Sequence, residues 1–174
     1  VRSSAASDVY KRQELKTKGY STAGALDTWC IDKESSISLL RSALKLYNLT
    51  SNKEYLDDAI AVSYYLSTWL WHYNGVYPEN DNFTQYNYKT FGATSVSVQH
   101  HHLDPYALFW VPEWFELTKL TGDSQWKEKA IAIWNNGCQL ISDGTLVING
   151  RVRPVGSQNE AYLPVSYTHL RAHE

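Results

Sequence analysis

The sequence has little positive charge, no long apolar run and only two cysteines, and each shortage argues against a class of protein. Its 16 Lys and Arg and 18 Asp and Glu give a formal net charge of −2, so nothing predicts nucleic acid as a partner. The richest apolar run, residues 64–71, is interrupted by Ser67 and Thr68 and is far shorter than the roughly 20 residues of a membrane span, which argues against a membrane partner. Cys30 and Cys138 lack the spacing of a metal site. Their pairing stays open, and the sequence favours two buried free thiols.

The two ends of the chain have the coding pattern of a sequencing-library adapter. Residues 3–13 read SSAASDVYKRQ, and residues 165–174 read VSYTHLRAHE. One set of codons for residues 8–13 is GAT GTG TAT AAG AGA CAG, and its reverse complement, read from the third base, encodes residues 165–169 (VSYTH). The same short DNA thus reads out at both ends in opposite orientations. We therefore expect residues 1–13 and 165–174 not to be native and to make no contacts with the core.

The remaining residues 14–164 are expected to be an internal fragment of a longer protein, forming one partial domain. Without the two ends, Lys and Arg fall from 16 to 12 and Asp and Glu from 18 to 16, so the formal charge of the segment is 12 − 16 = −4. All seven Trp lie in this segment. Such an excess is typical of a large helical core, or of a site in which aromatic rings stack on sugars.

Apolar residues recur at helical spacing over four stretches. In the first, Ile37, Leu40 and Leu44 share one face, and Ser35 or Ser36 can cap the helix. The four predicted helices, which form two antiparallel hairpins with tight connections, cover residues 35–50, 52–73, 104–121 and 123–142.

The predicted hairpins repeat at a fixed distance. Residues 46–61 (LYNLTSNKEYLDDAIA) share the pattern LxxLT, a polar turn, an aromatic residue and AIA with residues 117–132 (LTKLTGDSQWKEKAIA). The offset is 117 − 46 = 71 residues. Self-similarity at a constant period indicates repeated helical units that stack to share one core.

Two further segments do not fit the helical pattern. Residues 144–154 (GTLVINGRVRP) predict a small β-hairpin with a turn at Asn149-Gly150. The aromatic-rich segment 75–102 is too long for a simple connection and is interpreted as a functional rim loop or lid.

Helical hairpins with these LTSN and LTGD turns, separated by long aromatic loops, resemble the six-hairpin glycosidases. The resemblance covers residues 35–143 and implies an all-α fold, a fragment of an (α/α)6 toroid with a long loop and a small β-hairpin at its C-terminal end. Uronate lyases and terpenoid-cyclase-like proteins share the toroid. Two hairpins would be about a third of such a barrel, whose remainder would be the partner of this fragment.

In a toroid, each hairpin has one inner and one outer helix, and equivalent helices present equivalent ends. Helices starting at residues 35 and 104 are interpreted as inner, and a third inner helix is expected after residue 162. The polar clusters that precede these three helices are residues 27–34 (DTWCIDKE), 99–104 (QHHHLD) and 156–162 (GSQNEAY). They are expected to converge on one cleft at the mouth of the barrel.

Glycoside hydrolysis needs one carboxylic acid to protonate the leaving oxygen and a second carboxylate as base or nucleophile. The catalytic candidates are Asp32, Glu34, Asp104 and Glu160, and Asp27 also lies in the first polar cluster. For Asp32, Glu34 and Asp104, helix capping is the competing interpretation.

The histidine run suggests two roles. His100, His102 and Asp104 alternate along an extended segment and could ligate a metal ion, but adjacent loop histidines more commonly form hydrogen bonds, and we expect neither a metal nor a cofactor. The residues expected to bind substrate are Trp29, His100, His101, His102, Tyr106, Gln158 and Asn159.

The resemblance implies part of a bacterial glycoside hydrolase whose substrate is an oligosaccharide or polysaccharide, with the fragment alone expected to be inactive. A uronate polysaccharide lyase and a non-catalytic α-toroid scaffold remain alternatives. The sugar, the linkage, the stereochemical outcome and the oligomeric state stay open. A periplasmic or secreted location is favoured by analogy alone.

Overall fold

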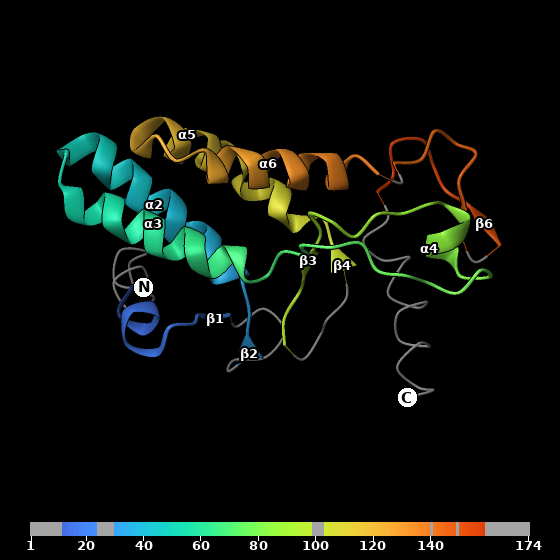
Figure 1. The fold of residues 1–174 in the computed structure, drawn as a ribbon, viewed down its shortest axis with the longest axis horizontal. Helices are drawn as coiled ribbons and strands as arrows, with labels where there is room; N and C mark the ends of the chain where they lie inside the picture. The colour runs from blue at the N-terminus through green and yellow to red at the C-terminus, as the bar shows by residue number, and fades with distance from the viewer. Residues whose placement is uncertain (1–11, 24–29, 99–102, 140, 149, 159–174) are drawn as a thin grey trace.

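The structure is a computed structural model that describes residues 12–23, 30–98, 103–139, 141–148 and 150–158 (Figure 1). Four helices dominate it. They are α2 (Glu34–Thr50), α3 (Lys53–Ser67), α5 (Val111–Thr121) and α6 (Ser124–Gly137). In Figure 1 the α2–α3 and α5–α6 hairpins lie side by side, and the short strands lie beyond the end at which α2 begins. The mainly helical fold predicted from the sequence is confirmed.

Two of the predicted helices end earlier than expected. Helix α3 ends at Ser67 rather than at Tyr73, because the following residues pair with a distant loop. The Trp71 N–H donates to Ala93 O at 2.9 Å, and Leu70 forms an isolated β-bridge with Thr94. Helix α6 likewise ends at Gly137 rather than near residue 142.

The third predicted helix is divided in two. Residues Tyr106–Trp110 form a 3-10 helix (η1), and α5 begins at Val111 with Pro112 in its first turn. Proline has no N–H to donate, and its ring would clash inside a longer helix, so the first α-helical turn is the place that accommodates it.

The 71-residue repeat is confirmed at the level of single hydrogen bonds. Ser51 and Gly122 end the first helix of each hairpin in the left-handed conformation, with φ of 55° and 75°. The next residues, Asn52 and Asp123, cap the second helix, and each side chain accepts a hydrogen bond from the backbone N–H two residues later. The two turns therefore have the same cap chemistry as well as the same spacing.

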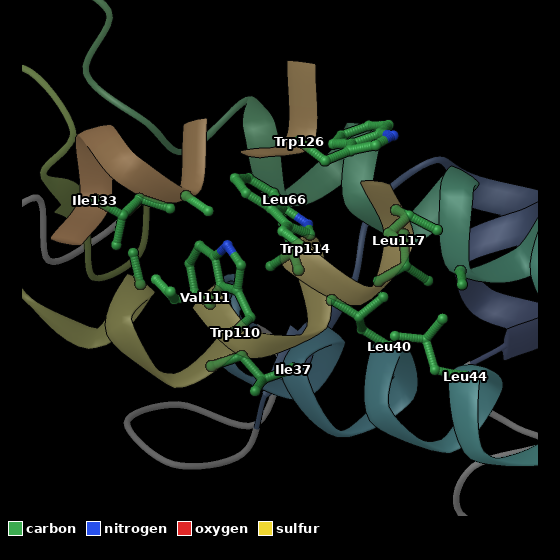
Figure 2. Packing of buried hydrophobic residues seen from close by; sticks show 14 of the residues in the cluster. Ile37, Leu40, Leu44, Leu66, Trp110, Val111, Trp114, Leu117, Trp126 and Ile133 are labelled. Atoms are coloured by element: carbon green, nitrogen blue, oxygen red, sulfur yellow. The ribbon is translucent and has the colours of Figure 1, made fainter. Parts of the chain in front are cut away.

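The core lies between the two hairpins and is rich in tryptophan (Figure 2). Trp110, Trp114 and Trp126 are fully buried, and successive rings are 5.9 Å and 5.7 Å apart. The Trp114 Nε1–H donates to the hydroxyl of Ser63 on α3 at 3.0 Å, so its polar atom has a partner inside the core. For these three rings the tryptophan excess reflects core packing.

Short antiparallel strands link the helices. The pairs are β1 (Thr22–Ala23) with β2 (Cys30–Ile31), β3 (Thr94–Ser95) with β4 (Leu103–Asp104), and β5 (Val147–Ile148) with β6 (Arg151–Val152). The β5–β6 pair confirms the predicted hairpin.

The long segment after α3 has a core of its own. It contains the short helix α4 (Asn82–Gln85) and a cluster in which Phe83, Tyr88, Ala93 and Leu103 are buried. The described part of the segment is thus a packed substructure with its own buried side chains.

A helix over residues 12–18 packs on α3 in the way that α3 packs on α6. Arg12 forms ion pairs with Glu54 and Asp58, and Lys16 Nζ lies 2.8 Å from the Asp58 carboxylate. Shifted by 71 residues, these two acidic positions are Gln125 and Lys129, which hydrogen-bond to Tyr64 and Ser67 of α3. Equivalent positions of α3 and α6 therefore each contact the helical segment that precedes them in the chain.

Arg12 belongs to residues 1–13, the segment that is expected to be adapter-derived. Residues 1–11 and 159–174 lie outside the described residues. Arg12 and Gln13 are described as the first residues of the 12–18 helix. The ion pairs of Arg12 are polar contacts with the face of α3, and the sequence did not anticipate them.

Candidate functional site

Two carboxylate-bearing segments meet where the first helices of the hairpins begin. Asp32 and Lys33 follow β2 and lead into α2, while Asp104 is the last residue of β4 and precedes η1. The Lys33 Nζ lies 2.5 Å from Asp104 Oδ2, and neither side chain has exposed surface. The Lys33 Nζ also donates to Ser95 O at 2.8 Å. The starts of the two repeats are thus joined by a buried charge pair.

Asp104 is held by neighbours on both of its oxygens. Its Oδ2 pairs with Lys33, and its Oδ1 accepts hydrogen bonds from the Thr94 hydroxyl at 2.6 Å and from the Tyr106 N–H at 2.9 Å. A buried carboxylate with this set of partners fixes the β3–β4 strands against α2. Both of its oxygens are occupied by groups of the protein, so its contacts support a structural role.

Asp32 differs from Asp104 because, among the described residues, its carboxyl group forms no ion pair, and Lys33 acts on it only through its charge. The residue is 3% exposed, and its Oδ1 accepts a hydrogen bond from the Glu34 N–H at 3.1 Å. Burial raises the pKa of Asp32 to about 6, with a further upward contribution from the charge of Glu34. The backbone amides of Ser35 and Glu34 and the charge of Lys33 lower it by less. Such a carboxyl group exchanges a proton near neutral pH.

Glu34 is the carboxylate whose charge contributes to the raised pKa of Asp32. It is the first residue of α2 and is half-buried, so it stands at the positive end of the helix dipole. Helix capping, the competing interpretation, applies in part. The Asp32 side chain does accept the N–H of Glu34, although Lys33, and not Asp32, is the residue that immediately precedes the helix.

Tyr106 and Gln158, both expected to bind substrate, are engaged by the protein itself. The Tyr106 ring lies 5.8 Å from Lys33 Nζ and 5.7 Å from the Phe109 ring. The Gln158 Nε2 donates to Gly137 O at the end of α6 at 2.8 Å. Tyr106 thus borders the buried ion pair, whereas Gln158 fastens the C-terminal segment to a helix end.

Several predicted site residues cannot be placed. The candidates that lie outside the described residues are Asp27, Trp29, His100, His101, His102, Asn159 and Glu160. The chain on the N-terminal side of the histidine run is placed, and the Val98 N–H donates to Ile31 O at 3.2 Å, beside Asp32. The convergence expected from sequence is therefore described only for Asp32, Glu34, Asp104 and Tyr106, which lie together.

Three residues that position this site were missed from sequence. Lys33 was overlooked although 33 + 71 = 104 places it at the repeat equivalent of Asp104. Ser21 and Tyr65 bind the main chain of Asp32, and no spacing in the sequence connects them with it.

Other chemistry in the described chain is limited. Both cysteines are free. Cys30 is buried as expected, but Cys138 is exposed, which corrects the prediction of two buried thiols. Among the described residues there is no group of three or more His, Cys, Asp and Glu side chains suited to a metal ion. No helix in the same part of the chain has both the length and the apolar character needed to cross a membrane.

Comparisons of the chain with protein-family models, with curated proteins and with solved structures found no match. The function is therefore inferred from the site itself.

Proposed function

We propose that the chain is part of a carbohydrate-active enzyme of the glycoside hydrolase type, built on a toroid of repeated helical hairpins. Asp32 is the general acid in this proposal, and Glu34 is the second carboxylate. The observation that carries the proposal is the environment of Asp32, a buried carboxyl group at the start of α2 whose pKa is raised to about 6 by burial and by Glu34. A general acid needs a pKa near the working pH, because it must hold a proton and then release it.

The repeat supports the toroid part of the proposal. Two hairpins share cap chemistry at an offset of 71 residues, and equivalent positions of α3 and α6 each contact a preceding helix. The two hairpins thus share both a turn and a stacking contact, which is the behaviour of a repeat architecture. In such an arrangement the starts of α2 and α5 face the same side, as the Lys33–Asp104 pair requires.

Asp104 has a different role from Asp32 in this proposal. Its ion pair with Lys33 fixes the spacing of the two helix starts. Asp32, the residue before Lys33, forms no ion pair within the described part of the chain and has a raised pKa. One acidic residue thus organises the rim, and the other supplies the chemistry.

The test is hydrolysis of a panel of oligosaccharides and aryl glycosides by the protein together with its natural flanking sequence. We expect Asp32→Asn to lower kcat by at least about a hundredfold, the scale of general acid–base catalysis. The matched control is Asp57→Asn on the exposed face of α3, which should leave the rate unchanged. Full activity of Asp32→Asn would refute the assignment. Release of an unsaturated uronate in place of a hydrolysed product would favour the lyase alternative.

A further inference from the structure

The main chain of Asp32 is held from two directions. On one side, the Asp32 N–H donates to Ser21 O at 3.1 Å, and the Ser21 hydroxyl donates back to Asp32 O at 3.0 Å. On the other side, the Tyr65 hydroxyl donates to the same Asp32 O at 2.6 Å and lies 3.4 Å from Ser21 O. The carbonyl of Asp32 is thus the meeting point of the segment before β1 and of helix α3.

Of the two hydroxyls that bind Asp32 O, the one from Tyr65 comes from α3, the second helix of the first hairpin. Its ring packs edge-on against Trp69 at 6.2 Å, which fixes the direction of the hydroxyl. Burial raises the pKa of Tyr65, so the hydroxyl stays protonated and remains a hydrogen-bond donor at all physiological pH values.

The repeat indicates that this position has a general task. Shifted by 71 residues, Tyr65, which is partly buried, becomes the buried Asn136 of α6. The Asn136 Nδ2 donates to Lys89 O at 2.8 Å and to Phe91 O at 3.4 Å. In both hairpins, therefore, this position of the second helix reaches out to carbonyl groups of a connecting segment. The difference is what the segment carries, since in the first hairpin it carries the candidate acid.

We infer that Tyr65 is a positioning residue that clamps the Asp32 carbonyl, so that the Asp32 carboxyl group stays buried at the start of α2. Its hydroxyl binds the main-chain carbonyl of Asp32, so its role in this inference is positioning and not catalysis. This inference rests on the proposed role of Asp32, but the clamp can be measured without any substrate.

Removing the hydroxyl should loosen the segment and let water reach the carboxyl group. Among the described residues, the charged groups that act on Asp32 are Glu34 and Lys33 from its own segment and α2, and Tyr65 is the titratable group from α3. None of the charges changes in Tyr65→Phe, so a shift in the titration of Asp32 would report its burial and not a lost charge.

The experiment compares the wild type, Tyr65→Phe and the matched control Tyr64→Phe. Tyr64 is the exposed neighbour whose ring packs on Trp126 and whose hydroxyl is 3.4 Å from Gln125 Nε2. The carboxyl carbon of Asp32, assigned with Asp32→Asn, is followed by NMR across pH, and amide exchange is measured at Asp32. In Tyr65→Phe we expect the titration midpoint to fall by about one pH unit toward the ordinary range. We also expect its amide to exchange about tenfold faster, the effect of losing one hydrogen bond.

Unchanged values in Tyr65→Phe would overturn the clamp, and so would an equal shift in Tyr64→Phe. If Tyr65→Phe does not fold, Ser21→Ala replaces it, because this change removes the other hydroxyl on Asp32 O, and the same two readouts apply. If Tyr65→Phe shows the shift but Asp32→Asn keeps full hydrolytic activity, the clamp is supported and the proposed function is refuted.

Discussion

Lys33 and Asp104 occupy equivalent positions in the two repeats, and their side chains form a fully buried ion pair of 2.5 Å. The pair joins the helix starts directly, so each hairpin fixes the register of the other. It also brings the segment after β2 against the segment after β4, which places Asp32 at the boundary of the two units.

The Lys33→Met variant should lose about 3–5 kcal/mol of unfolding free energy, because it leaves the Asp104 carboxylate buried without its cation. Replacing both partners, with Asp104→Leu added, should cost less than the single change. Urea unfolding measures both. Arg41→Met is the control, since Arg41 pairs with Glu113 at an exposed site and should cost at most about 1 kcal/mol. Equal losses for Lys33→Met and Arg41→Met would contradict this prediction.

The stability of the protein should depend on pH through Asp32. Its pKa is about 6 in the folded state and 3.8 ordinarily, so the folded state binds this proton more tightly than the unfolded state. The favourable contribution is complete below about pH 4 and is lost as pH rises through about 6. Asp32→Asn keeps an oxygen for the Glu34 amide but cannot ionise. The stability of the variant relative to the wild type should therefore rise by on the order of 1–2 kcal/mol between pH 4 and pH 7.

Urea unfolding of both proteins at several pH values checks this expectation. Asp57→Asn at an exposed position of α3 serves as the control and should give a curve parallel to that of the wild type. A difference between Asp32→Asn and wild type that stays constant from pH 4 to pH 7 would show that Asp32 is not perturbed.

Two tryptophans test where the core lies. Trp114→Ala should cost about 3–5 kcal/mol, since the ring is fully buried and bridges α5 to Ser63 of α3. Trp134→Ala removes a ring that is 57% exposed and should change stability by no more than about 0.5 kcal/mol. Thermal or urea unfolding distinguishes the two. A large loss at Trp134 would mean that its face of α6 is covered in solution.

Gly92 of the long loop lies against the backbone of α6. Its φ is +86°, and an added Cβ would lie 2.2 Å from Ala132 O, so Gly92→Ala should cost about 2 kcal/mol or more. Gly122→Ala is the control because its φ is +75° but nothing lies within 4 Å of an added Cβ, and it should cost about 1 kcal/mol. Amide exchange at Gly92, whose N–H donates to Trp71 O, should rise only in the first variant. An equal loss of unfolding free energy in both variants would contradict the close contact at Gly92.

The helical part of this fold was readable from sequence because its signals are local. Apolar spacing, polar caps and the 71-residue repeat define four helices and two turns, and the turns of Ser51–Asn52 and Gly122–Asp123 form as the pattern predicts. The β5–β6 hairpin follows in the same way from its β-branched residues and its turn. The ends of α3 and α6 were misplaced because their limits depend on distant partners. Trp71 leaves the helical path to pair with Ala93, a contact that no local preference encodes.

For the candidate site too, some features could be predicted from the sequence and others depended on tertiary contacts. Residue type and repeat position were enough to select Asp32, Glu34 and Asp104 as acidic residues before the first helices. What each of them does was decided by tertiary contacts. Lys33 reaches across to form a buried ion pair with Asp104, while burial and the charge of Glu34 raise the pKa of Asp32. Protonation depends on desolvation and on charges brought close only by folding, so the chemistry of a carboxylate is a property of the packed structure, whereas its place in the repeat is a property of the sequence.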